Sequence, residues 1–143
     1  MTRPLYETQQ DRDNEQAMAR IMEARWKCTL HKMPIKYTLD FAAQKDGRVI
    51  GFVEMRQRRI PMHKYSTYMI ALHKVLKAQE LSKATGLPCV LAIRWTDKIG
   101  VVGIGGADLQ YEIEINGTTR RNDPQDIEPM ALINITDFQE ITP

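Results

Sequence analysis

The sequence predicts an α/β fold in which a helix, an antiparallel hairpin, a long helix and a buried central strand are followed by further C-terminal strands. Three observations predict it. Apolar residues recur at helical spacing from Glu7 to about Lys27, with no Gly or Pro between them. Asp46-Gly47 is a two-residue hairpin signal between apolar-rich segments. The run from Cys89 to Trp95 is almost wholly apolar, which is typical of a strand buried on both faces.

The first predicted helix is amphipathic, and a short strand is expected after it, near Thr29 to His31. Pro34 separates this part from the main hairpin, whose strands are Tyr37 to Gln44 and Val49 to Gln57. The helix positions expected to be apolar on one side are Ala17, Met18, Ile21, Ala24 and Cys28.

The second helix is predicted from Ser66 to Thr85, because this segment contains no Gly or Pro. Ser66 is its expected N-cap, and Gly86 ends it. The helix side expected in the core carries Tyr68, Leu72, Val75 and Leu76. Beyond the central strand, strands are predicted at Val101 to Ile104, Leu109 to Ile115 and Met130 to Ile135, with a turn at Asn116-Gly117 and a polar loop from Arg120 to Glu128.

The 143 residues suit one domain with a real core. No segment approaches the roughly 18 to 20 uninterrupted apolar residues of a membrane span, and the first residues lack the apolar core of a signal peptide. We therefore expect a single domain over residues 1–143, located in the cytoplasm and without a membrane partner.

Charge is distributed unevenly along the chain. Residues 1–106 carry 18 Lys and Arg against 10 acidic residues, a net charge of +8, whereas residues 107–143 carry 2 against 8, a net charge of −6. A basic body suits a polyanion such as nucleic acid. The alternative is a solvated surface with unevenly scattered charges.

Two carboxylates at matching ends of the predicted hairpin are candidates for a metal site. Asp40 lies near the open end of the first strand, and Glu54 lies fourteen residues later near the matching end of the second. Two carboxylates held close together repel each other unless a cation lies between them. The strand period puts Glu54 and Arg56 on one face, so an exposed ion pair worth at most about 1 kcal/mol is the alternative. The run from Arg56 to Arg59 has an alternative too, as a solvated strand edge that discourages edge pairing.

The order of these elements resembles the core of the PD-(D/E)xK nuclease superfamily, the restriction-endonuclease-like fold. The resemblance covers about residues 10–97, with residues 98–143 as a C-terminal strand extension. Gly51 to Arg58, which reads Gly-Phe-Val-Glu-Met-Arg-Gln-Arg, resembles the apolar strand of the family that ends in Glu-x-Lys-x-Arg. Arg56 stands where the family has Lys, and Leu39 precedes Asp40 where the family motif has Pro.

The resemblance implies a catalytic site that binds Mg²⁺ or Mn²⁺. Asp40, Glu54 and the backbone carbonyl of Met55 would be the metal ligands. Arg56, which is always cationic, would contact the phosphate and its transition state. Glu15 on the first helix would assist, with Glu23 as the second choice. Lys74 or Lys64 could supply the function of the missing lysine, and Gln79 resembles a polar helix residue that some members direct at the site.

The function expected is that of a metal-dependent endonuclease acting on DNA, with branched DNA or single-stranded junctions as possible substrates and a homodimer making paired cuts. Phosphates beside the cut would meet Arg58, Arg59, His63 and Lys64, while Tyr65 and Tyr68 would contact sugar or base. Two alternatives stay open. One is a catalytically inactive module of this fold that binds nucleic acid or a protein, and the other is a structural or assembly protein.

Overall fold

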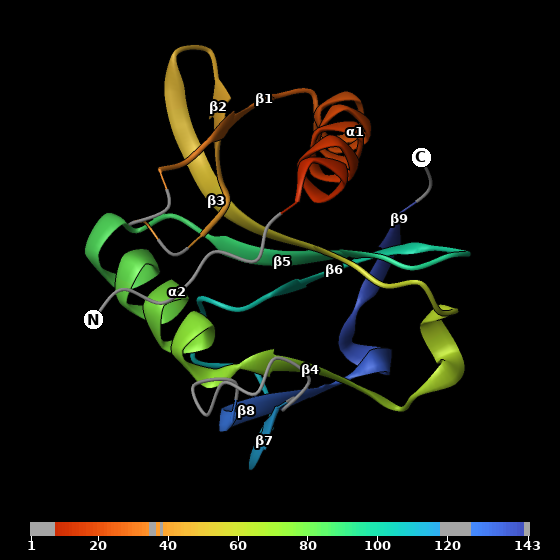
Figure 1. Ribbon diagram of the computed structural model, residues 1–143. Coiled ribbons are helices and arrows are strands. Elements are labelled where there is room, and N and C mark those ends of the chain that lie inside the picture. Colours follow the sequence, from red (N-terminus) through yellow and green to blue (C-terminus); the bar gives the residue numbers. More distant parts are fainter. Residues whose placement is uncertain (1–7, 35–36, 38, 118–126, 142–143) are drawn as a thin grey trace.

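The structure is a computed structural model, which describes residues 8–34, 37, 39–117 and 127–141. Its centre is a mixed six-stranded sheet with the order β1-β2-β3-β5-β6-β9 (Figure 1). The strands of this sheet are β1 (Thr29–Lys32), β2 (Phe41–Lys45), β3 (Arg48–Gln57), β5 (Cys89–Arg94), β6 (Ile99–Gly103) and β9 (Gln139–Ile141). β3 and β5 run parallel, whereas the other neighbouring pairs are antiparallel. The predicted central position of β5 is confirmed.

The six-stranded sheet is covered on both faces (Figure 1). Helix α1 (Gln9–Trp26) packs on one face. The other face meets helix α2 (Leu72–Thr85) and a second antiparallel sheet with the order β4-β8-β7. The strands of this second sheet are β4 (Thr67–Ala71), β8 (Ile127–Asn134) and β7 (Glu112–Gly117). Short 3₁₀ turns at Met62–Lys64 and Ile135–Asp137 connect the two sheets.

Helix α1 is confirmed, but its buried side differs from the prediction. Thr8 caps it by accepting a hydrogen bond from the Asp11 backbone N–H, and the Asp11 carboxylate accepts one from Thr8 in return. The predicted Met18 is fully buried together with Ala19 and Met22, which were not predicted, whereas the predicted Ala17 and Ala24 are exposed. The apolar stripe was misassigned by about one position because so few apolar residues mark the first half of this helix.

The hairpin prediction is confirmed at its turn. Asp46 and Gly47 both have positive φ, 52° and 78°, as a two-residue turn of this kind requires. The first strand begins later than predicted, at Phe41, so that Asp40 directly precedes β2. Val53 and Met55 face α1, while Glu54 lies on the opposite face, as the strand period predicts.

The predicted start of the second helix is wrong. Thr67–Ala71 forms β4, and α2 begins only at Leu72, with Ala71 at the N-cap position and no side-chain cap. The segment Thr-Tyr-Met-Ile-Ala pairs along its whole length with β8, so a long-range pairing overrides the absence of helix-breaking residues. Tyr68 is therefore a buried strand residue, and Leu76, predicted as core, is half exposed.

The C-terminal part forms the predicted strands with shifted ends. Asn116 and Gly117 continue β7 and pair with Glu128 and Ile127, so the predicted turn at this dipeptide is wrong. Most of the predicted polar loop lies outside the described residues.

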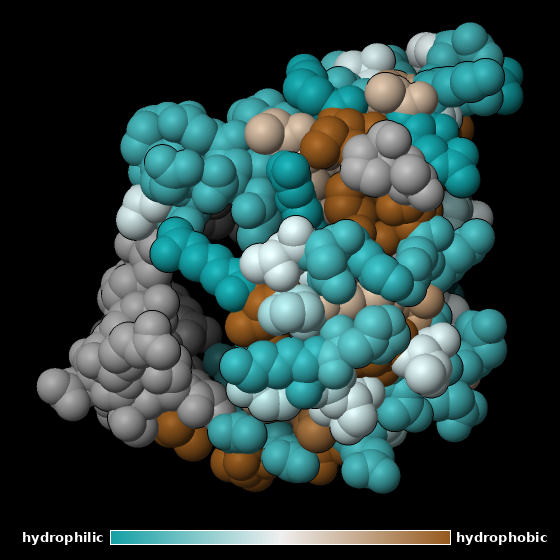
Figure 2. All heavy atoms as spheres, turned by 90° about the vertical axis from the view of Figure 1, so that its right-hand side faces the viewer, coloured by the Kyte–Doolittle hydropathy of each residue, from teal (hydrophilic) through white to brown (hydrophobic). Residues whose placement is uncertain are grey.

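Within the described part of the chain, no helix is both long and apolar enough to cross a membrane. The face shown in Figure 2 is mostly hydrophilic, with apolar side chains visible in separate patches.

Candidate active site

Asp40 and Glu54 meet where β2 begins beside β3. The Asp40 backbone N–H donates a hydrogen bond to the Val53 carbonyl at 3.1 Å, and its carboxylate accepts one from the Met55 N–H at 2.8 Å. Asp40 is thus tied to β3 through both its main chain and its side chain. This pairing fixes its carboxylate next to the segment that carries Glu54.

Glu54 is the only fully buried charged residue of the described chain, with no exposed area. The pKa of Glu54 is raised from 4.5 to about 7, chiefly by burial; the nearby Asp40 carboxylate also raises it, whereas Arg56 and Lys74 lower it. Its Oε2 atom makes no hydrogen bond, although the Arg56 guanidinium forms an ion pair with it. The alternative of an exposed Glu54–Arg56 pair does not fit this burial.

The Arg56 guanidinium contacts all three groups predicted to bind a metal. One of its amino nitrogens pairs with Glu54 Oε2. The other lies 3.0 Å from the Met55 carbonyl oxygen and 3.6 Å from Asp40 Oδ2. Oxygen atoms of Glu54, of the next residue Met55 and of Asp40 therefore converge on one cationic group.

A second cation contacts the other carboxylate oxygen of Glu54. Lys74, in the first turn of α2, places Nζ 3.4 Å from Glu54 Oε1, and its side chain is largely buried. The two oxygens of Glu54 thus face different cations, Lys74 and Arg56. Lys74 stands among the positions predicted to supply the missing lysine, and the fold brings it to Glu54.

Glu15 reaches the cluster indirectly. Lys32, the last residue of β1, lies with Nζ 2.5 Å from Glu15 Oε1 and 3.7 Å from Asp40 Oδ1. Lys32 therefore bridges the helix acid and the strand acid. The prediction did not include Lys32, since only the pairing of Lys32 with Phe41 in the β1–β2 register brings it beside Asp40.

The other predicted residues lie away from these contacts. Glu23 accepts a hydrogen bond from the Leu30 N–H at 2.7 Å and pairs with Arg20, so it anchors β1 to α1. Gln79 is half-buried on α2. Arg59 is exposed, and Lys64 lies over the Tyr65 ring. Arg58 lies over the Tyr68 ring, which packs edge-on against Trp95 and Phe138.

The oxygen atoms of the cluster suit a hard divalent cation such as Mg²⁺ or Mn²⁺. Such ions take oxygen ligands, and Mg²⁺ in particular binds through one or two carboxylates while keeping several waters. Within the described residues, no three His, Cys, Asp or Glu side chains lie close enough together to hold one metal ion by themselves. Two carboxylates, one of them fully buried, and one backbone carbonyl fit this sparse ligand set.

Comparisons with known proteins bear on the family and the fold of the chain. A family model described as "Phage putative PDDEXK endonuclease" matches residues 1–141. The solved structure of Hjc, a Holliday junction resolvase from the archaeal hyperthermophile Archaeoglobus fulgidus, is similar with a TM-score of 0.56 at 12% identity, covering 90% of this chain and 92% of that chain. This likeness confirms the predicted fold class. The comparison with curated proteins gives no match. Because the family model spans almost the whole sequence, the chain belongs to this family of phage PDDEXK endonucleases.

Proposed function

We propose that the chain is a divalent-metal-dependent endonuclease that hydrolyses phosphodiester bonds of DNA, including branched DNA or single-stranded junctions. The observation that carries the proposal is the convergence of Asp40, Glu54 and the Met55 carbonyl on one cationic group, the Arg56 guanidinium. Oxygen atoms that surround the guanidinium cation in this way also suit a divalent metal ion. The match to an endonuclease family supports the same reaction.

Asp40, Glu54 and the Met55 carbonyl would hold Mg²⁺ or Mn²⁺. The ion, when bound, supplies positive charge to the phosphate and lowers the pKa of a water molecule. The chain orients these ligands before the ion arrives, since the Asp40 carboxylate is already held by the Met55 N–H. Glu15 acts through Lys32, whose ammonium group keeps the Asp40 carboxylate turned toward the site.

Arg56 binds the phosphate. Its guanidinium is planar, always charged and suited to bidentate contact with two phosphate oxygens. Such a contact stabilises the charge that builds up on those oxygens in the transition state. Lys74 adds a second positive charge on the α2 side of Glu54. The flanking phosphates are bound by Arg58, Arg59 and Lys64, which are exposed after the end of β3.

A homodimer in the cytoplasm completes the proposal. Ile113 and Ile115 of β7 are 56% and 70% exposed, and β7 is an edge strand of the second sheet. Exposed apolar side chains on an edge strand favour association. Sedimentation of the wild type and of Ile115→Lys tests this point, and a wild type that stays monomeric at high concentration contradicts it.

The first test is cleavage of supercoiled plasmid and of a labelled branched duplex with Mg²⁺, Mn²⁺ or EDTA. The variants Asp40→Asn and Glu54→Gln keep the shape of the site and remove one ligand charge each. Glu80→Gln, which removes an exposed carboxylate on α2, is the matched control. We expect metal-dependent cuts in the wild type and the control, and their loss in both site variants. Equal cleavage by all four proteins would contradict the assigned site.

The contacts of Arg56 favour a second candidate, an inactive nuclease-fold module that binds DNA. Its guanidinium already neutralises the carboxylates that a metal would need. A folded protein that binds DNA at low salt but never cuts it would support this candidate. Gain of cleavage by Arg56→Lys would then identify a nuclease that lost its activity through this one position.

A further inference from the structure

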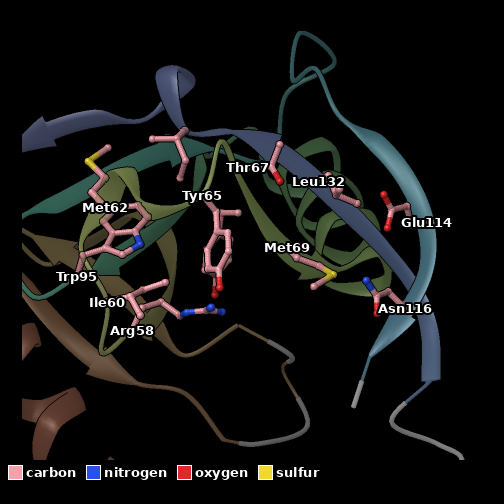
Figure 3. A pocket seen from close by; sticks show the side chains of 12 residues that line it. Arg58, Ile60, Met62, Tyr65, Thr67, Met69, Trp95, Glu114, Asn116 and Leu132 are labelled. Atoms are coloured by element: carbon pink, nitrogen blue, oxygen red, sulfur yellow. The ribbon is translucent and has the colours of Figure 1, made fainter. Parts of the chain in front are cut away.

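A cavity of about 320 Å³ opens beyond the end of β3 (Figure 3). Residues from the three strands of the second sheet and from the segment between β3 and β4 line it, together with Trp95 just after β5 and Ile135 just after β8. Its volume lies at the lower end of the range for ligand cavities, about 300 to 1,000 Å³. A cavity of this size suits a single ring system better than a peptide segment.

The walls combine apolar surface with polar groups on opposite sides. Met69 and Leu132 of the second sheet and the ring of Tyr65 provide apolar and aromatic surface. Figure 3 shows Arg58 on one side of the hollow and Glu114 and Asn116, both from β7, on the other. The polar groups thus include a cation, an anion and an amide.

This combination restricts the chemistry of a ligand. A simple anion would meet the carboxylate of Glu114, and a simple cation would meet the guanidinium of Arg58. A wholly apolar ligand would cover these polar groups without offering them a hydrogen bond. A nucleobase is flat and uncharged, stacks through its faces and carries donors and acceptors on its edge, so it matches all of these groups.

The cavity is connected to the candidate active site through Tyr68. The Tyr68 side chain lines the cavity, and the Arg58 guanidinium lies 5.8 Å from its ring centre. Burial raises the pKa of Tyr68, and the charges of Arg56 and Arg58 act on it in the opposite direction, so both guanidinium groups lie near its hydroxyl. Arg58 follows Arg56 by two residues, and its N–H donates to the Arg94 carbonyl, which continues the line of β3. A DNA strand with a phosphate at Arg56 therefore has its neighbouring nucleotide close to the cavity.

We infer that this cavity receives an unpaired base of the DNA, from a nucleotide beside the phosphate bound by Arg56. The inference rests on the proposed function and narrows its substrate class to DNA with an unpaired base at the cut. A base within continuous duplex must leave its stack to enter such a cavity, whereas a bulged or junction base is already free. Stacking on aromatic side chains then favours the unpaired substrate.

The test compares two DNA duplexes of the same sequence, with the full-length protein in EDTA so that neither is cut. One contains 2-aminopurine as an unpaired, bulged base, and the other contains it paired with thymine. We expect the bulged duplex to bind at least about fivefold more tightly, because one stacked base contributes about 1 to 3 kcal/mol. We also expect its fluorescence to fall as the base stacks against tyrosine.

Two cavity variants and one control complete the design. Leu132→Trp fills the cavity, and Asn116→Leu removes a hydrogen-bonding group from its edge without filling it. Both should reduce the preference for the bulged duplex to below about threefold while the paired duplex binds as before. Gln110→Trp, which lines a different cavity, should keep the preference. The Asn116→Leu result decides the test if the tryptophan variant does not fold.

The outcomes separate this inference from the proposed function. Equal binding of both duplexes by the folded wild type, with unchanged fluorescence, overturns the base-binding cavity even if the protein cuts plasmid. A preference that both cavity variants retain overturns it as well. Failure to bind either duplex, together with no cleavage under any metal condition, overturns the proposed function itself and the inference with it.

Discussion

Glu54→Gln is expected to make the folded protein more stable at neutral pH, although it removes a central residue of the site. Glu54 is fully buried, and burial raises its pKa from 4.5 to about 7. The ionised carboxylate is therefore less favourable in the folded than in the unfolded chain. Glutamine has nearly the same shape and cannot ionise, so the variant avoids this cost.

The sign and size follow from the two pKa values of Glu54. Below about pH 4.5 the carboxyl group is protonated in both states and does not oppose folding. Between about pH 4.5 and 7 the unfolded chain has released its proton while the folded chain keeps it, so stability falls as the pH rises; above about pH 7 both states are ionised and the loss is complete. The shift from 4.5 to about 7 corresponds to roughly 3 kcal/mol at 1.36 kcal/mol per pKa unit. The wild type therefore loses up to this amount between pH 4.5 and pH 8, whereas Glu54→Gln does not.

Urea denaturation in EDTA at several pH values between 4.5 and 8 measures this difference. We expect the free energy of unfolding of Glu54→Gln minus that of the wild type to grow by about 2 to 3 kcal/mol across the range. Glu80→Gln, which removes an exposed carboxylate, controls for the general effect of charge. Parallel profiles for wild type and Glu54→Gln would refute the reasoning, because they would mean that Glu54 ionises in the folded chain as it does in water.

Three further changes test other parts of the structure. Arg56→Gln should bind Mg²⁺ at least about tenfold more tightly in the absence of DNA, because it removes a cation that contacts the ligand oxygens. The same variant should cut DNA more slowly. Calorimetry measures the Mg²⁺ affinity and plasmid cleavage the rate, with Arg56→Lys as the control that keeps the charge. Lys32→Met should slow cleavage. It should lower the free energy of unfolding by less than about 1 kcal/mol, because the Lys32 side chain is 39% exposed. A larger loss of stability in urea denaturation would show that Lys32 has a structural role. Gly51→Ala should destabilise the folded protein by about 1 to 3 kcal/mol, because the added Cβ would lie 3.0 Å from the Pro88 carbonyl oxygen. Gly103→Ala, whose Cβ would lie in open space, is the control. Equal melting temperatures of the two variants would contradict the predicted clash.

The sequence was sufficient for the parts of the fold that local chemistry determines. Asp46-Gly47 specifies a turn with two positive φ angles, and the apolar run from Cys89 specifies a buried strand, whatever the rest of the chain does. The segment Thr67–Ala71 was assigned to a helix because its strand partner, β8, lies some sixty residues later. The residues of a short segment do not by themselves indicate a strand partner so far away in the sequence.

The same distinction applies to the candidate site. Asp40 and Glu54 were recognised because a hairpin joins them, and the structure brings them together. Lys32 was missed because its approach to Asp40 depends on the β1–β2 register rather than on any motif. Lys74 could be named from the sequence, but only the packing of α2 against the sheet shows that it reaches Glu54.

The charges around Glu54 link metal binding to DNA binding. Ion pairs link three acidic and three basic side chains in one network, which has no net charge once Glu54 is ionised; they are Glu15, Asp40, Glu54, Lys32, Arg56 and Lys74. A divalent cation adds charge to a balanced cluster, which weakens its binding. A DNA phosphate at Arg56 draws the guanidinium away from the carboxylates and leaves them for the ion. The affinity for Mg²⁺ should therefore rise when non-cleavable phosphorothioate DNA is bound, and the affinity for DNA should rise with Mg²⁺ by the same factor. Titrations of each ligand with and without the other measure this coupling, and a factor of one would show that Arg56 keeps its contacts with Asp40 and Glu54 in the complex.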